Sequence, residues 1–314
     1  MAGKKRSCYS GIGGQAVLEG VMMKNKDKYA VAVRRPDGGI SVEVDNYTGI
    51  LGGGKIKDIP FVRGVFNFID SLILGMRCLN FSASFYEEEG ESQPEKKNGA
   101  SDKLMSVVVT CISLVLAVGI FIVLPYYLAS LLNGRLRNQS LIAIIEGVVR
   151  ILIFILYVSG ISLMKDIRRL YRYHGAEHKC INCIEKGRAL TVDNAMRSSR
   201  LHKRCGTSFL FFVFFVSIIL FFFIRVENPV ARVGLRILLM PVVAGISYEI
   251  IRLAGRTDFF LVRLISAPGM AIQRMTTKEP DRQMVEVAIA SVEAVFDWKK
   301  YLREQFGYEP EGDI

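Results

Sequence analysis

The five residues His174-Gly175-Ala176-Glu177-His178 form the pattern in this sequence that most directly indicates chemistry. They read H-x-x-E-H, the inverted order of the H-E-x-x-H zinc signature. Histidines four residues apart share one face of a helix, so both rings can reach one metal ion. The glutamate between them can then act as a general base on a water molecule. The pattern predicts a site for zinc, or for another divalent metal, in which Glu177 is the catalytic residue.

A catalytic zinc ion takes three protein ligands and leaves one position for water. Glu249, His202 and Cys205 are the candidates for the third ligand, because each lies downstream and carries a donor that zinc accepts. An alternative is that the two histidines of the pattern bind lipid phosphates or cap the end of a basic helix. Cys180 and Cys183 have no second C-x-x-C pair, so we interpret them as structural thiols.

The composition indicates an integral membrane protein with sizeable polar parts. Hydrophobic residues make up 51% of the chain, yet 23% of the residues are charged, and the net charge is +11. An excess of basic residues is common in nucleic-acid-binding proteins, but it is equally common in the cytoplasmic loops that flank membrane helices. The six cysteines are scattered and do not resemble a disulfide framework. The basic N-terminus leads into glycine and polar residues, which is unlike a secretory signal peptide.

Four segments have the length and apolar character of membrane spans: 104–132, 141–164, 207–224 and 233–253. The connection 165–206, between the second and third segments, is rich in lysine and arginine. By the positive-inside rule this connection and both termini lie in the cytoplasm. These spans must position the H-x-x-E-H pattern, which follows the second one directly, at the cytoplasmic membrane face.

Glu146 and Arg150 are charged residues inside the second apolar segment. They are four residues apart on one helix face and can pair with each other. Charges within a span are costly and mark candidate functional sites, such as a polar cavity or a transport path. The alternative is a structural pair that holds helices together.

The predicted fold class is mainly α: a polytopic helical membrane protein with about four transmembrane helices. It has a small cytoplasmic N-terminal region containing β-structure, because the β-prone runs 29–33 and 40–44 flank a Pro-Asp-Gly-Gly turn. Amphipathic helices are expected at 61–86 and in the C-terminal tail.

The sequence divides into six predicted regions. They are 1–60, a hairpin-containing region; 61–103, an amphipathic helix and acidic linker; 104–164, the first pair of spans; 165–206, a basic loop; 207–254, the second pair of spans; and 255–314, an interfacial or re-entrant segment followed by a C-terminal helix from 279 to 301.

Six motifs, in order along the chain, carry a resemblance to a known family. They are Gly13 to Met23, Ala32 to Gly38, His174 to Lys179, His202 to Phe209, Tyr248 to Ile250, and Gln273 to Pro280. Together they resemble the DUF1385 family, the YqhQ-like membrane proteins of bacteria. The resemblance implies a multi-pass protein of the bacterial cytoplasmic membrane with an uncharacterised activity, often described as a predicted metal-dependent enzyme. Lys203 stands where many members carry proline, and it touches no proposed ligand.

The motifs and topology together predict a zinc-dependent membrane enzyme, hydrolytic in action, with a lipid or a membrane peptide as its substrate. One alternative is a non-enzymatic scaffold or insertion factor that binds the ribosome or the translocon through the basic connection. The family's gene neighbours, which include translation-termination genes, favour this alternative. A transporter or channel that uses Glu146 and Glu249 is another. Homo-oligomers are compatible with each of these functions.

Overall fold

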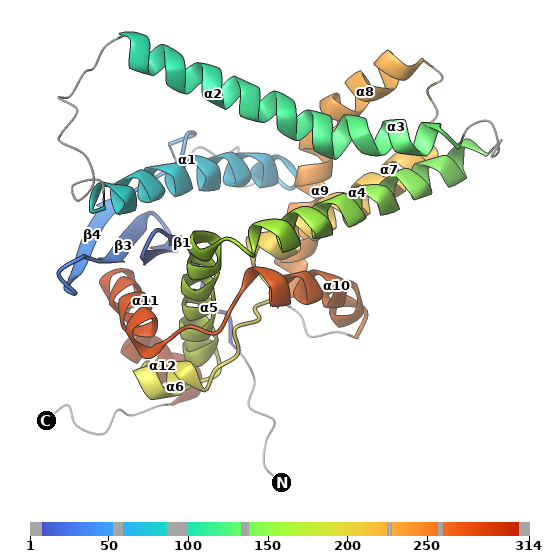
Figure 1. The fold of residues 1–314 in the computed structure, drawn as a ribbon. Helices are drawn as coiled ribbons and strands as arrows, with labels where there is room; N and C mark the ends of the chain where they lie inside the picture. Colours follow the sequence, from blue (N-terminus) through green and yellow to red (C-terminus); the bar gives the residue numbers. More distant parts are fainter. Residues whose placement is uncertain are drawn as a thin grey trace, which may run out of the picture.

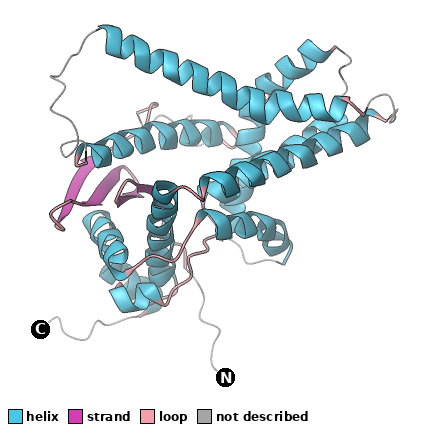
Figure 2. Ribbon diagram, viewed as in Figure 1, coloured by secondary structure: helices cyan, strands magenta, loops and turns pink. Residues whose placement is uncertain are grey.

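The computed structural model describes residues 8–52, 59–86, 100–132, 138–224, 226, 228–256 and 260–307. Within these residues the chain is mainly helical, and a single sheet lies near the N-terminus (Figure 1). Figure 2 shows that the strands gather at one side of the molecule, whereas the long helices extend away from them. This arrangement confirms a mainly helical protein with a small N-terminal β-region.

The sheet has four antiparallel strands in the order β1-β2-β3-β4. The predicted hairpin is confirmed as the pair β3 and β4, in register with Arg34 opposite Ile40. The first two strands were not predicted: β1 contains a glycine pair of low β propensity, and β2 has no run of β-branched or aromatic residues. Gly20 lies so close to the next strand that an added Cβ would be 2.3 Å from the carbonyl oxygen of Ala32. The strands are β1 (Ile12–Val17), β2 (Gly20–Asn25), β3 (Lys28–Arg34) and β4 (Ile40–Asn46).

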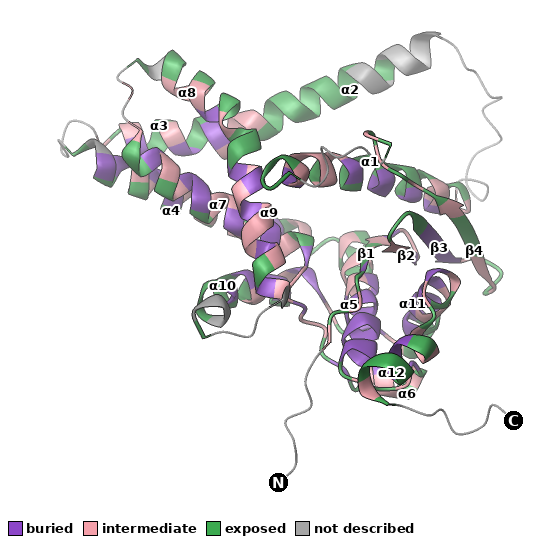
Figure 3. Ribbon diagram, turned by 180° about the vertical axis from the view of Figure 1, so that it is seen from behind, coloured by how far each residue is buried: buried purple, intermediate pink, exposed green. Residues whose placement is uncertain are grey.

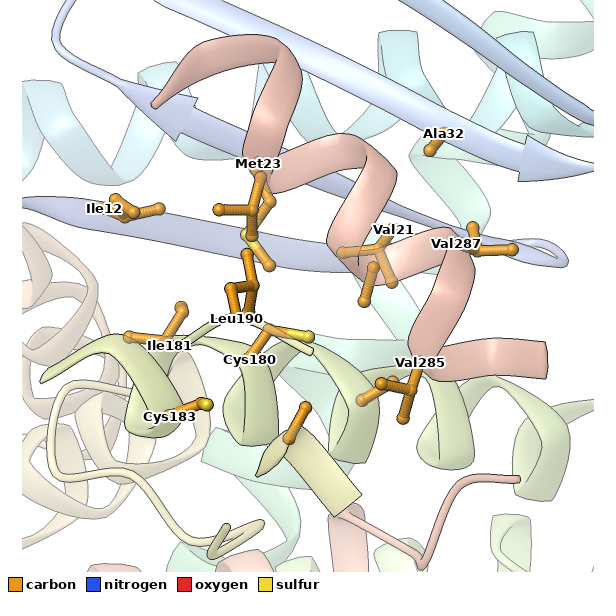
Figure 4. Packing of buried hydrophobic residues seen from close by; sticks show 14 of the residues in the cluster. Ile12, Val21, Met23, Ala32, Cys180, Ile181, Cys183, Leu190, Val285 and Val287 are labelled. Carbon is orange, nitrogen blue, oxygen red and sulfur yellow. The ribbon is translucent and has the colours of Figure 1, made fainter. Parts of the chain in front are cut away.

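Both faces of the sheet are covered, each by different helices. One face packs against α5 (Lys165–Glu185) and α11 (Arg282–Val295), where it forms the larger apolar core (Figure 4). Met23 and Val21 point from the sheet into this core, toward Cys180 of α5 and Val285 of α11. The other face packs against α1 (Val62–Ser84), where Leu74 and Cys78 contribute to a second apolar core. The sheet therefore brings the N-terminal and C-terminal parts of the chain together around α5.

The helix α1 confirms the helix predicted at 61–86, and its two sides differ. Leu74 and Cys78 are buried against the sheet, whereas Leu72, Ile73 and Met76 are exposed. Exposed apolar side chains along one side of a helix are typical of a helix that lies on a membrane surface.

Within the described part of the chain, three helices are long and apolar enough to cross a membrane, and a bent pair of helices passes the same test as a fourth candidate. The first candidate is the continuous helix formed by α2, η3 and α3, which is exposed over most of its described side chains (Figure 3). The elements are α2 (Ala100–Val118), the π-helical turn η3 (Gly119–Val123), α3 (Leu124–Ser130), α4 (Gln139–Ile161), α7 (Gly206–Phe223), α8 (Pro229–Leu238) and α9 (Met240–Arg256).

The structure corrects the sequence-based prediction in the fourth apolar segment. Instead of one helix, α8 and α9 form two helices that meet at an angle of 42°. Leu239 closes α8, and the next helix carries Pro241 within its first turn. A proline cannot donate a backbone hydrogen bond to the preceding turn, so the helical ladder is interrupted there.

The segment 165–206, predicted as a basic loop, is largely an ordered and buried part of the fold. We expected the second apolar helix to continue into the H-x-x-E-H pattern, but it does not. The helix α4 ends at Ile161, and Met164 has extended backbone angles. The chain turns there, and α5 departs from the axis of α4 (Figure 1). Beyond α5, the short helix α6 (Val192–Met196) leads toward α7.

The C-terminal part also differs in detail from the prediction. α10 (Phe260–Thr276), which packs against α7, covers most of the segment 259–275 that we predicted to be interfacial or re-entrant. The predicted helix from 279 to 301 is divided into α11 and α12 (Trp298–Phe306). α11 begins only after Asp281, whose carboxylate accepts a hydrogen bond from the Met284 amide at 2.9 Å as the N-cap. α11 is a core helix, since Val285, Val287 and Val292 are fully buried.

Candidate functional site

The helix α5 presents His174, Glu177 and His178 along one face. This part of the helix is almost fully enclosed, and His178 is only 1% exposed. Gly175 permits the enclosure: an added Cβ would lie 2.0 Å from the carbonyl oxygen of Lys278. The Lys278 amide also donates a hydrogen bond to the Tyr171 carbonyl at 2.9 Å, so the segment after α10 crosses directly over the pattern. The glycine of H-x-x-E-H is therefore required by close packing.

Cys205 completes a cluster with the two histidines. One donor atom each from His174, His178 and Cys205 lies within 4.8 Å of the others. The His174 Nε2 atom is 3.2 Å from the Cys205 Sγ atom, and the two imidazole centroids are 4.4 Å apart. Cys205 is the N-cap of α7, where its sulfur accepts a hydrogen bond from the Thr207 amide at 3.4 Å. The cluster thus joins α5 to the start of an apolar helix.

Backbone carbonyl groups orient both imidazole rings of the cluster. His174 Nδ1 lies 3.0 Å from the Thr276 carbonyl oxygen, and His178 Nδ1 lies 2.7 Å from the Arg200 carbonyl oxygen. A carbonyl can only accept a hydrogen bond, so in the neutral rings each Nδ1 carries the proton and donates it. In this neutral form each Nε2 carries a lone pair, whereas protonation of His174 places a second proton on its Nε2, which faces the Cys205 sulfur. The neutral arrangement is the one by which proteins orient metal-binding histidines.

Electrostatics within the cluster favour a thiolate. Burial alone would raise the pKa of the Cys205 thiol, but the adjacent His174 and His178 rings outweigh burial and hold its pKa well below the usual range. Burial alone would lower the pKa of His174, but the neighbouring Cys205 and Glu177 raise it to about 9. Two imidazoles and one thiolate are a donor set that suits zinc and related soft divalent cations.

Glu177 lies beside the cluster and is held by the first strand of the sheet. Its Oε2 atom is 4.0 Å from His174 Nε2, and the side chain is 6% exposed. The Gly14 backbone hydrogen-bonds the carboxylate, yet burial still raises the pKa of Glu177. An added Cβ at Gly14 would lie 2.9 Å from the Glu177 Cγ atom. A buried carboxylate with a raised pKa next to a donor cluster is suited to proton transfer.

Two of the predicted third ligands lie outside this cluster. His202 is close, with its ring centroid 5.6 Å from that of His178, but its Nε2 atom faces Glu185 at 3.3 Å. Glu249 on α9 is directed instead to Arg63 at the start of α1, whose Nε donates to it at 2.6 Å. The prediction that Glu249 approaches the pattern therefore does not agree with the geometry, because the guanidinium of α1 occupies its carboxylate.

The predicted pair of Glu146 and Arg150 is present, with a nitrogen–oxygen distance of 2.8 Å. The sequence alone did not indicate that Arg236 joins it. Arg236 lies 2.5 Å from the other carboxylate oxygen of Glu146. Arg150 also donates a hydrogen bond to Ser217 of α7 at 3.2 Å.

Cys180 and Cys183 behave as structural thiols. Both are fully buried in the core beneath the sheet (Figure 4). Burial raises the pKa of each, and that of Cys183 to about 11. All six cysteines of the chain are free. Neither Cys180 nor Cys183 belongs to the donor cluster.

Sequence reasoning did not assign a role to Gly14, Thr276 or Arg200, although Thr276 and Arg200 orient the two histidines and Gly14 packs against Glu177. Two of them lay within recognisable signals: Gly14 in the glycine-rich N-terminal motif, and Thr276 in the motif that ends at Pro280. Arg200 contributes only its backbone carbonyl to His178, and a backbone contact leaves no signal in side-chain type.

Comparisons with known proteins place the chain in a family without assigning an activity. Residues 59–298 match the family described as "Protein of unknown function (DUF1385)". The chain is also 37% identical over 286 residues to "Uncharacterized protein YqhQ" of Bacillus subtilis (strain 168). That alignment covers 89% of this chain and 90% of the relative. No solved structure matches the chain. Since both the family model and a similar full-length relative cover most of the sequence, the chain belongs to the DUF1385 family.

Proposed function

We propose that this protein is a metal-dependent hydrolase of the cytoplasmic membrane face. The observation that carries the proposal is the convergence of two imidazole rings and one thiol, from His174, His178 and Cys205, beside the buried carboxylate of Glu177. Zinc, or another divalent cation, would be held by the three donors. A bound metal of this kind lowers the pKa of water and polarises a substrate carbonyl or phosphoryl oxygen.

The residues around the donors would perform the remaining steps. Glu177 would accept a proton from the attacking water and return it to the leaving group, as a general base and then a general acid. The Gly14 backbone holds this carboxylate in place. Thr276 and Arg200 hold the two rings in the tautomer that presents Nε2. Enclosure between α5, α7 and α10 restricts water around the reacting groups.

The setting supports a substrate associated with the membrane. Cys205 directly precedes α7, one of the helices that are apolar enough to cross a bilayer. The positive-inside rule assigns the segment 165–206, and with it the cluster, to the cytoplasmic side. The protein would then be a multi-pass protein of the bacterial cytoplasmic membrane, with both termini in the cytoplasm. A lipid or a membrane peptide near the cytoplasmic end of α7 would reach the cluster.

The alternative of a ribosome- or translocon-binding scaffold draws less support, because much of the basic segment is paired within the protein. Arg169 pairs with Glu19, and Lys179 lies 3.0 Å from Glu279. Arg204 pairs with Glu185. Cations in internal ion pairs contribute less to binding of phosphate backbones than free ones do. The further pairs in this segment are Arg172 with Asp281 and Arg200 with Glu279.

The transporter alternative also draws less support. Glu146 forms ion pairs with Arg150 and Arg236, and Glu249 with Arg63. A carboxylate held between fixed cations is poorly suited to binding and releasing protons or cations during transport.

The decisive experiment is metal analysis by mass spectrometry on the full chain, purified in detergent without chelators. We expect about one zinc or other divalent ion per chain in the wild type, as for a catalytic site with three protein ligands. The His174→Ala/His178→Ala double variant should lose it. The matched control is His202→Gln, which removes the third histidine and should retain the metal.

Glu177→Gln separates metal binding from catalysis. This variant should keep the metal and lose turnover of lipid or peptide substrates, since only the proton acceptor is removed. A folded wild type without bound metal would overturn the proposal, and so would a double variant that binds as much metal as the wild type. Folding is monitored by the fluorescence of Trp298, the only tryptophan in the chain.

A further inference from the structure

A second charged cluster lies at the other end of the apolar helices from His174 and Cys205. Glu146 belongs to the first half of α4, whereas α5 follows the last residue of that helix. The fifteen residues from Glu146 to Ile161 span roughly 22 Å at 1.5 Å per residue. The outer cluster consists of Glu146 and Arg150 of α4 and Arg232 and Arg236 of α8. Ser217 and Phe221 of α7 lie beside it, so three helices meet there.

Among the described residues, the outer cluster holds more positive than negative charge. Its single carboxylate, Glu146, is shared between Arg150 at 2.8 Å and Arg236 at 2.5 Å. Arg232 lies beside the same hollow and adds a third cation. Uncompensated charge among apolar helices is unfavourable unless an opposite charge is supplied. A bound anion would therefore compensate the excess positive charge of the outer cluster.

Two guanidinium groups of the outer cluster carry donors with no partner among the described residues. They are Arg236 NH1 and Arg150 Nε, both shielded from solvent. The two residues are only 6% and 7% exposed. A buried donor without an acceptor costs about 1–3 kcal/mol, and more if it is charged. Such donors are normally satisfied, so these two indicate an acceptor that the chain itself does not provide.

A small hollow lined by Arg236, one of these two residues, is suited to an anionic oxygen. It has a volume of about 20 Å³ and is partly open to the outside. Its lining combines the Glu146, Arg232 and Arg236 side chains with the ring of Phe221. A space of this size accepts one or two oxygen atoms, since one water needs about 10–15 Å³ measured in this way. A larger anion would place one or two oxygens inside and extend the rest outward.

We propose that the outer cluster binds a phosphate group, on the face of the molecule opposite the His174 and Cys205 cluster. Guanidinium forks match the oxygens of phosphate in geometry and charge, and they bind phosphate with two parallel hydrogen bonds. The phosphate belongs either to the headgroup of an anionic phospholipid or to inorganic phosphate. Both satisfy the same donors, and experiment separates them. This site is independent of the metal proposal.

The test uses the full chain in detergent and two probes. Native mass spectrometry measures retention of dioleoyl-phosphatidylglycerol, with dioleoyl-phosphatidylcholine as the zwitterionic comparison. Equilibrium dialysis measures binding of inorganic phosphate. The main variant is Arg232→Gln, because Arg232 is only partly buried and its loss should leave the fold intact. Arg236→Gln is the second variant, and Arg77→Gln, an exposed arginine of α1, is the matched control.

Arg232→Gln should weaken binding of the phosphate probe roughly tenfold, as expected for loss of one charge-assisted hydrogen bond. Arg236→Gln should weaken it further, and Arg77→Gln should leave it unchanged. Selective retention of phosphatidylglycerol would identify a lipid headgroup as the source. Binding of inorganic phosphate alone would identify a free anion. A wild type that binds neither probe would overturn the proposal, and so would equal binding by Arg232→Gln and Arg77→Gln.

Discussion

The Nε2 atom of His174 lies 3.2 Å from the Sγ atom of Cys205, although the two residues are 31 positions apart in the chain. This contact joins the buried helix α5 to the first residue before the apolar helix α7. It also shows that Cys205 is the residue, among the three downstream candidates for the third ligand, that lies with His174 and His178. The predictions below follow from this contact and from the groups that surround it.

Replacing Cys205 should weaken metal binding without unfolding the protein. Cys205→Ser removes the thiolate but keeps a small N-cap side chain for α7. Because thiolate is the softer and stronger zinc ligand, we expect affinity to fall by roughly tenfold or more. Competition with a chromogenic chelator measures the change. Cys183→Ser, which alters a buried thiol outside the cluster, is the control. Equal affinities of the two variants would contradict a ligand role for Cys205.

Two adjacent glycines allow a matched test of how the sheet supports Glu177. An alanine Cβ at Gly14 would approach the Met22 carbonyl oxygen at 2.7 Å and the Glu177 Cγ at 2.9 Å, whereas nothing lies within 4 Å of one at Gly13. Gly14→Ala should therefore destabilise the protein by about 1–3 kcal/mol, the usual range for overpacking. Gly13→Ala should be nearly neutral. Thermal unfolding followed by Trp298 fluorescence compares them, and similar melting temperatures would argue against this packing.

Glu249 should be dispensable for metal binding but not for stability. Its carboxylate accepts a hydrogen bond from Arg63 Nε at 2.6 Å, and the two side chains are 21% and 17% exposed. Glu249→Gln should leave the metal content unchanged and lower stability by about 0.5–1 kcal/mol, since solvent screens a partly exposed pair. Metal analysis and thermal unfolding check the two parts. Loss of the metal in this variant would restore Glu249 as a ligand.

Glu185 should make the protein sensitive to acid. Burial alone would raise its pKa, but hydrogen bonding and charge from His202 and Arg204 lower it from 4.5 to about 2. A carboxylate with a depressed pKa stabilises the folded state above pH 4.5, and this contribution is lost as the pH falls from 4.5 toward 2. The shift corresponds to roughly 3 kcal/mol.

The expected result for Glu185→Gln is lower stability at neutral pH and a weaker dependence on pH below 4.5. The amide cannot supply the negative charge that faces Arg204. Glu304→Gln, on the exposed side of α12, should keep the wild-type pH dependence. Trp298 fluorescence during acid titration gives both curves. Parallel acid unfolding of Glu185→Gln and the wild type would show that Glu185 is not the group responsible.

Features that depend on local spacing along the chain could be predicted before the fold was known. His174 and His178 share a face with Glu177 because residues three and four apart are neighbours on any helix. The pairing of Glu146 with Arg150 follows from the same rule. The β3–β4 hairpin follows from its turn residues, and the apolar helices follow from their length and composition.

Which distant residues join these local patterns depends on how the helices and the sheet pack together. Glu249, His202 and Cys205 all carry suitable donors, and the choice among them depends on how α7 and α9 pack against α5 and α1. The partnership of Arg236 with Glu146 depends likewise on the bend between α8 and α9. Such contacts result from the packing of whole elements, and a pattern within one segment carries no record of its neighbours.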